Sequence, residues 1–105
     1  MSEVLTDEQR RSWTERGFFR LPGFAPPETC EGMLSRVTQV VREPALAATL
    51  GVKVVPESNK AGMAVAHPED GVSKIFKLHR DSVFAEFAHS APVVDPVSEL
   101  IAPDI

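Results

Sequence analysis

Residues 26–43 read PPETCEGMLSRVTQVVRE, and they carry the clearest structural signal in the chain. Their apolar residues recur at the i, i+3, i+4 and i+7 spacing of one buried helix face. These residues are Cys30, Met33, Leu34, Val37, Val40 and Val41. A proline is tolerated in the first helical turn and disfavours helical geometry in the residue before it. The positions of Pro26, Pro27 and Pro44 therefore predict a helix that starts at the proline pair and stops by Glu43.

A shorter helix is predicted ahead of this one, over residues 6–16. Thr6 followed by Gln9 fits a capping box, and the two acidic residues between them lie where the helix dipole favours negative charge. Gly17 stands where the C-terminal cap of a helix needs a positive φ. Trp13 is the one large apolar residue of this segment, so we expect it to anchor the helix.

The segments between and after these helices are shorter. Residues 18–24 form a brief extended run closed by a Pro22-Gly23 turn. Residues 45–50 are ambiguous, with a helical turn closed by Gly51 as one interpretation. Three β-rich runs follow, over residues 52–55, 63–66 and 72–78. Because Asp70-Gly71 is a turn signal, we expect the last two runs to form a hairpin.

The final third of the chain is predicted to be helical again. Asp81 or Ser82 can cap a helix, and a second helix begins near Pro92 and ends at Ala102-Pro103. The apolar residues at helical spacing are Val83, Phe84, Phe87 and Ala88 in the first helix and Val93, Val94, Val97, Leu100 and Ile101 in the second. Taken together, the predicted elements indicate an α+β fold.

Length and composition limit the function classes. The chain has 105 residues, room for one small domain, and its 43% apolar and 25% charged residues are ordinary for a globular protein. A net charge of −4 without a basic stripe argues against binding to nucleic acid or to an anionic membrane. One cysteine cannot form an internal disulfide or a multi-thiolate zinc site. No signal-peptide pattern or long apolar run is present, so we expect a cytoplasmic location.

The sharpest local pattern for chemistry is His79-Arg80-Asp81. One interpretation is an H-x-D pair from a 2-His-1-carboxylate iron site, but the only later histidine, His89, follows too closely to serve as the distal ligand. A second is the H-R-D of a kinase catalytic loop, whose other motifs are missing here. The third interpretation is structural and is the one we favour: Asp81 caps a helix and His79 ends a strand.

The remaining candidate residues have ordinary structural interpretations. His67 is expected in a loop, and His89 near a helix C-terminus, where the dipole favours a cation. Cys30 lies on the apolar face of its helix and is expected to be a buried thiol. Lys74 and Lys77 are expected to be solvated, with an anionic substrate as the alternative. The six phenylalanines and the tryptophan are expected in the core. We therefore predict no catalytic, cofactor-binding or metal-binding residue in this chain.

Four segments, taken in order, resemble the N-terminal part of the phytanoyl-CoA dioxygenase family. They are LTDEQ at 5–9 with Trp13 and Gly17-Phe18-Phe19, then LPGF at 21–24, then KLHRD at 77–81 with Phe84, and finally Val97 with LIAPD at 100–104. Family members typically begin with a similar capped helix and short strand, and later carry an "L-H … F … L-L-G-P-D" segment. Ala102 departs from this pattern, where the family often has glycine. None of these motifs is catalytic, so the order and spacing carry the resemblance.

The resemblance implies a parent protein that is a non-haem Fe(II), 2-oxoglutarate-dependent oxygenase acting on a small molecule. Its fold is a double-stranded β-helix, a jelly roll of the cupin type. The family's iron-binding H-x-D pair, its distal histidine and its 2-oxoglutarate-binding arginine all lie after the region matched here. His79-Arg80-Asp81 aligns with a helix before the barrel, so none of these roles is carried onto this chain.

We therefore expect residues 1–105 to be a single incomplete domain that is inactive alone. The competing hypothesis is a stand-alone, non-catalytic interaction or oligomerisation module, with helix faces that form a homo-oligomer interface. A third is a small metal protein that uses His79 and Asp81.

Overall fold

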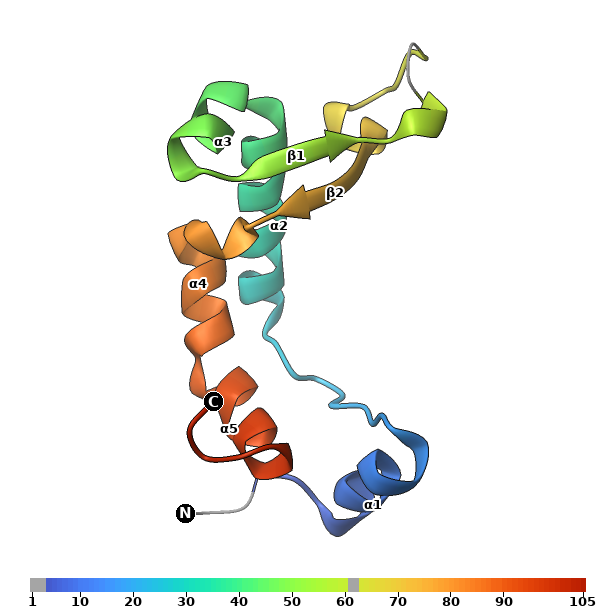
Figure 1. Cartoon of the computed structure of the whole chain (residues 1–105), viewed down its shortest axis with the longest axis vertical. Coiled ribbons are helices and arrows are strands. Elements are labelled where there is room, and N and C mark those ends of the chain that lie inside the picture. Colours follow the sequence, from blue (N-terminus) through green and yellow to red (C-terminus); the bar gives the residue numbers. More distant parts are fainter. Residues whose placement is uncertain (1–3, 61–62) are drawn as a thin grey trace. The chain divides into compact units, whose positions relative to one another are not determined.

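The computed structural model describes residues 4–60 and 63–105 as helices with a small two-stranded sheet (Figure 1). In chain order, the elements are α1 (Asp7–Arg16), α2 (Pro27–Arg42), α3 (Pro44–Leu50), β1 (Lys53–Pro56), the 3₁₀ turns η1 (Ser58–Lys60) and η2 (Pro68–Gly71), β2 (Val72–Phe76), the 3₁₀ turn η3 (Leu78–Arg80), α4 (Ser82–His89) and α5 (Ala91–Leu100). The predicted α+β class is confirmed. Within the described residues, no helix is both long and apolar enough to cross a bilayer.

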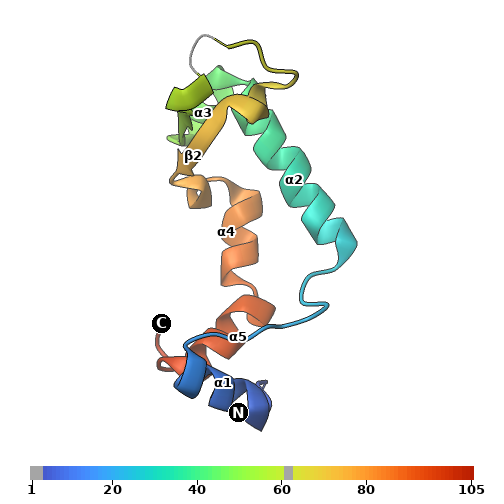
Figure 2. The ribbon, with the colours of Figure 1, turned by 90° about the vertical axis from the view of Figure 1, so that its right-hand side faces the viewer.

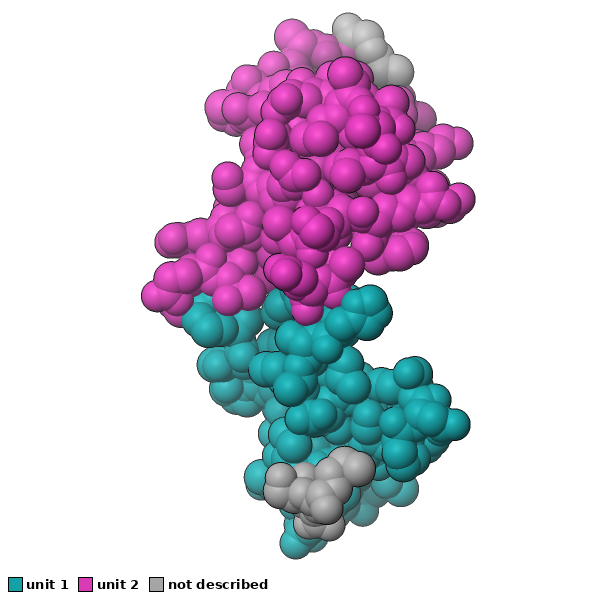
Figure 3. Space-filling model, turned by 90° about the vertical axis from the view of Figure 1, so that its left-hand side faces the viewer, with its two compact units in different colours: residues 1–26, 87–105 teal, residues 27–86 magenta. Residues whose placement is uncertain are grey.

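The chain divides into two compact units, coloured separately in Figure 3. The first unit combines the residues up to Pro26 with Phe87–Ile105, and the second unit is Pro27–Glu86. Each unit is described by itself below.

In the first unit, α1 has the predicted caps. The Thr6 hydroxyl accepts a hydrogen bond from the Gln9 amide at 3.1 Å, and the Gln9 side chain accepts one from the Thr6 amide at 2.9 Å. Gly17 ends the helix with a φ of 80°. Pro22-Gly23 forms a turn, as predicted, and Gly23 has a φ of 66°. The helix α5 also matches its prediction and begins directly after Ser90.

In the second unit, the predicted long helix is confirmed as α2, and the ambiguous stretch after it is helical as α3. The small core contains Val40 of α2, Ala47 of α3 and Val52, which precedes β1. Leu46, Leu50, Val54, Ile75 and Leu78 pack around it. The strands and α3 gather at the C-terminal end of α2 (Figures 1 and 2), so this end of the helix positions the core.

The predicted hairpin is wrong. The sheet pairs β1 with β2 antiparallel, with Val54 opposite Ile75, and residues 63–66 are not a strand. Asp70-Gly71 lies at the end of the turn η2, where the Asp70 carboxylate accepts a hydrogen bond from the His67 amide at 3.2 Å. Pairing β1 with β2 packs Val54 and Ile75 against the core, whereas Met63 remains 63% exposed. Packing therefore determined the strand pairing, and the local side-chain hydrogen bond determined the turn.

Several burial predictions are also wrong. Cys30 is exposed, and so is Leu34 on the same helix face, at 67%. Trp13, Phe18 and Phe76 are exposed as well, instead of lying in the core. For Cys30 and Leu34 the reason is the size of the core: only the C-terminal part of α2 meets α3 and the sheet. Helical spacing identifies which side of a helix is apolar, but burial also needs a packing partner along its whole length.

Candidate functional site

Asp81 is the most deeply buried ionisable residue described, with no exposed surface. It directly precedes α4, and one of its carboxylate oxygens, Oδ2, accepts a hydrogen bond from the Val83 amide at 3.2 Å. Its backbone carbonyl accepts the first helical hydrogen bond, from the Ala85 amide at 2.9 Å. These contacts define an N-terminal cap, so the predicted structural role of Asp81 is confirmed.

The second carboxylate oxygen of Asp81 forms an ion pair that the sequence did not reveal. Asp81 Oδ1 lies 2.7 Å from Nε of Arg36, on α2, whose side chain is 26% exposed. The Nη1 group of Arg36 donates a further hydrogen bond to Gln39 at 2.8 Å. Arg36 is not among the apolar residues at helical spacing in α2, so the periodicity gives no reason to place it beside a buried group. Its position one turn before the fully buried Val40 was the only signal that it faces the interior.

The other two residues of the His79-Arg80-Asp81 pattern face different surroundings. His79 is exposed in η3, three residues after the end of β2, so the prediction that it ends a strand is wrong. It is not part of the contacts of Asp81. The Arg80 guanidinium donates to the carbonyl oxygen of Gly51 at 3.3 Å. Among the described residues, no group of three metal-ligating side chains comes together. Asp81 therefore caps a helix, Arg80 contacts the loop at Gly51, and His79 faces solvent.

His67 belongs to a small polar cluster at the surface of the second unit. The Arg42 guanidinium forms two hydrogen bonds to the Glu69 carboxylate, at 2.7 and 3.0 Å, and its Nη2 lies 3.5 Å from Nδ1 of His67. The hydrogen bond from Arg42 lowers the pKa of Glu69, and the Glu69 carboxylate raises the pKa of Arg42. His67 precedes η2 in an exposed loop, as predicted. The cluster joins the end of α2 to η2.

The remaining sequence candidates are exposed. His89 is the last residue of α4, where it was predicted. Lys74 and Lys77 are both solvated, as favoured, and the Lys74 ammonium lies 5.5 Å from the centre of the Phe76 ring. Lys77 has a φ of 64°, a left-handed conformation that ends β2 and starts η3.

In the first unit, Glu99 of α5 holds the N-terminal segment. Its carboxylate accepts hydrogen bonds from the backbone amides of Val4 and Leu5 and lies 3.3 Å from a guanidinium nitrogen of Arg10. The same nitrogen of Arg10 donates to the Leu5 carbonyl at 2.8 Å. The backbone hydrogen bonds, that of Val4 first, and the Arg10 charge lower the pKa of Glu99. Leu5 is buried, so the cluster fixes the chain directly before α1.

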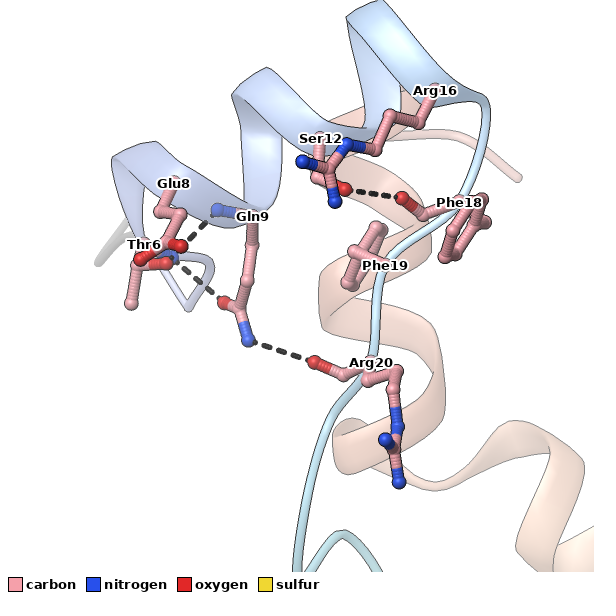
Figure 4. Close-up of a pocket in the computed structure, with 8 residues that line it drawn as sticks. All are labelled: Thr6, Glu8, Gln9, Ser12, Arg16, Phe18, Phe19 and Arg20. Atoms are coloured by element: carbon pink, nitrogen blue, oxygen red, sulfur yellow. Dashed lines mark hydrogen bonds between the residues drawn. The ribbon is translucent and has the colours of Figure 1, made fainter.

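A surface hollow of about 380 Å³ lies between α1 and the extended segment that follows it (Figure 4). We call it the N-terminal hollow. Thr6, Glu8, Gln9, Ser12 and Arg16 line one side, and Phe18, Phe19 and Arg20 line the other. Two hydrogen bonds join the sides. The Ser12 hydroxyl donates to the Phe18 carbonyl at 2.6 Å, and Nε2 of the Gln9 side chain donates to the Arg20 carbonyl at 3.2 Å. No sequence motif marks this hollow, so it could not be predicted from the sequence.

A second hollow, of about 430 Å³, lies beside the core of the second unit. Its walls come from the end of α2, from α3 and from β1, and they are apolar apart from Lys53. A single amine at the rim of an aliphatic surface supplies neither an acid–base pair nor a set of metal ligands. Of the two hollows, the N-terminal one has the richer polar chemistry.

Comparison with known proteins gives no match: no family model fits this chain, and neither a curated protein nor a solved structure is significantly similar to it.

Proposed function

We propose that this chain is the leading, non-catalytic region of an Fe(II), 2-oxoglutarate-dependent oxygenase of the phytanoyl-CoA dioxygenase type. The observation that carries the proposal is the order of the four motifs along the sequence. Each motif coincides with a structural boundary. LTDEQ contains the α1 capping box, LPGF contains the turn at Gly23, KLHRD runs through η3 to the cap of α4, and LIAPD begins at the end of α5.

In this proposal, the chain supplies packing elements and no iron ligands. Asp81 has a structural role, because Arg36 and the first turn of α4 occupy both of its carboxylate oxygens. The iron and 2-oxoglutarate would be bound by residues outside the region matched here, and together with O₂ they would supply the hydroxylation chemistry.

The competing function is a non-catalytic interaction module. The observation that favours it is the exposure of large apolar side chains in both units, including Leu34 at 67% and Phe18 at 59%. Exposed apolar groups of this size are common at protein interfaces. The same exposure fits a region that packs against further parts of an oxygenase, so the two functions need an experiment to separate them.

The first test reads the coding sequence beyond the codon for Ile105. The oxygenase proposal expects an H-x-D motif and a later histidine in the same frame. A natural stop codon there, together with a stable dimer of the 105-residue chain in analytical ultracentrifugation, would favour the interaction module instead.

The second test uses the extended protein and measures Fe(II)-dependent conversion of 2-oxoglutarate to succinate. We expect the wild type and His79→Ala to turn over equally, because His79 is exposed and makes none of the hydrogen bonds of the Asp81 carboxylate. Replacing the downstream H-x-D histidine by alanine should abolish turnover. Loss of turnover in His79→Ala, with its far-UV circular dichroism unchanged, would instead indicate that this residue is an iron ligand.

A further inference from the structure

We propose that the N-terminal hollow is a binding site for a small organic anion with an aromatic body, independent of any iron chemistry. The ligand class combines a phosphate or carboxylate group with a flat apolar ring. The hollow contains two arginines whose guanidinium groups make no hydrogen bond to another described residue, and two phenylalanines lie between them.

The arginines of the hollow differ from those that stabilise the fold. Arg10, Arg36, Arg42 and Arg80 all donate side-chain hydrogen bonds to other residues. Within the described part of the chain, the guanidinium groups of Arg16 and Arg20 have no carboxylate or carbonyl partner. A guanidinium offers a planar set of donors that matches phosphate and carboxylate oxygens. Both groups therefore keep their full donor capacity for a ligand.

The wall between the arginines is aromatic. Figure 4 shows the Phe19 ring between Arg16 at one end of the hollow and Arg20 at the other. The Phe18 side chain is 59% exposed, which leaves apolar surface for a flat ligand. The rear of Phe19 is supported, because Trp13 packs edge-to-face against it with ring centres 6.2 Å apart. The hydrogen bonds from Ser12 and Gln9 hold the segment in place, so the wall exists before a ligand binds.

The one negative group in the lining is Glu8, which is exposed on the first turn of α1. Its carboxylate opposes an anion at that end of the hollow. The favoured position for the acidic group is therefore beside the guanidinium groups of Arg16 and Arg20 and away from Glu8, with the ring against the phenylalanines between them. Substitution of Glu8 by glutamine should strengthen binding, a direction opposite to the effect of losing either arginine.

The test titrates phenyl phosphate into the 105-residue chain and follows the ¹H–¹⁵N signals of residues 16–20 and the fluorescence of Trp13. Benzyl alcohol supplies a ring without charge, and inorganic phosphate supplies charge without a ring. We expect phenyl phosphate to bind more tightly than either compound. Arg16→Gln and Arg20→Gln should each weaken its binding about fivefold, as expected for an accessible charge pair. Glu8→Gln should tighten it.

Arg11→Gln is the matched control, because Arg11 is an exposed arginine of the same helix that does not line the hollow. It should leave the affinity within about twofold of the wild type. Equal losses in Arg11→Gln and Arg16→Gln would reduce the effect to general surface charge and overturn the proposal. Inorganic phosphate binding as tightly as phenyl phosphate would overturn the role of the rings. All four substitutions change exposed side chains, and far-UV circular dichroism verifies the fold.

Discussion

Removal of the Asp81 carboxylate is the most informative perturbation of this fold. Asp81→Ala removes two interactions at once: the cap on the Val83 amide and the ion pair with Arg36. Loss of an N-terminal cap costs about 1 kcal/mol. Loss of one partner of a fully buried ion pair costs about 3–5 kcal/mol. Because Arg36 is 26% exposed and regains some hydration, we take about 2 kcal/mol for the pair, giving a total of about 3 kcal/mol.

Asp81→Asn tests the same reasoning more finely. The aspartate offers one oxygen to Arg36 and the other to the Val83 amide. Asparagine keeps one acceptor, and its NH₂ group then faces one of these two donors. We expect its free energy of unfolding to fall by about 1–2 kcal/mol, a smaller loss than that of the alanine variant. This variant also keeps the test informative if Asp81→Ala fails to fold.

The assay is urea unfolding at pH 7, followed by far-UV circular dichroism. With the urea dependence typical of small proteins, a loss of about 3 kcal/mol lowers the unfolding midpoint by at least about 1 M. Glu86→Gln is the control, since Glu86 is an exposed carboxylate on the same helix, and it should stay within about 0.5 kcal/mol of the wild type. Asp81→Ala unfolding at the same urea concentration as Glu86→Gln would refute the buried-pair argument.

Three further outcomes are expected. The stabilisation from Glu69, whose pKa is lowered by Arg42, should be complete above the ordinary carboxyl pKa of about 4.3 and lost as the pH falls through its lowered value. The stability difference between wild type and Glu69→Gln in urea titrations should therefore shrink from pH 7 to about pH 3, and a constant difference would contradict it. Gly17→Ala should destabilise the protein by about 1 kcal/mol in thermal melts, because Gly17 has a φ of 80°. Gly32→Ala should instead stabilise it by about 0.5–1 kcal/mol, because Gly32 lies within a helix and has open space around it. Cys30 should react with a thiol reagent at the same rate in native and urea-unfolded protein, and strong native protection would contradict its exposure.

Local signals predicted the elements of this fold well. The capping box at Thr6, the glycine at position 17 and the proline at position 44 each act on the backbone within a few residues, so their effects are readable from sequence. The same reasoning failed for Asp70-Gly71, where a hydrogen bond from the His67 amide formed a 3₁₀ turn instead of a hairpin. A turn dipeptide shows where the chain bends, but it does not show which strands pair.

Long-range features could not be predicted from the sequence. Arg36 and Asp81 are 45 positions apart, and nothing in their local patterns links them. The N-terminal hollow depends on how the chain returns along α1 after Gly17, which no motif encodes. The prediction of buried residues failed for a related reason. Leu34 fits the helical spacing of apolar residues, but no described element covers it. Sequence periodicity specifies a face, whereas packing partners and ion pairs arise only from the three-dimensional arrangement.

The His79-Arg80-Asp81 pattern shows how this limit affects functional interpretation. An iron site of the H-x-D type needs both side chains to reach one accessible point. Here the Asp81 carboxylate has no exposed surface, and its two oxygens are taken by Arg36 and the Val83 amide. To reach a metal, Asp81 would have to release both contacts, at a cost of about 3 kcal/mol by the reasoning above. The start of a helix therefore explains why this motif ends in aspartate, and the contacts of Asp81 stabilise the fold.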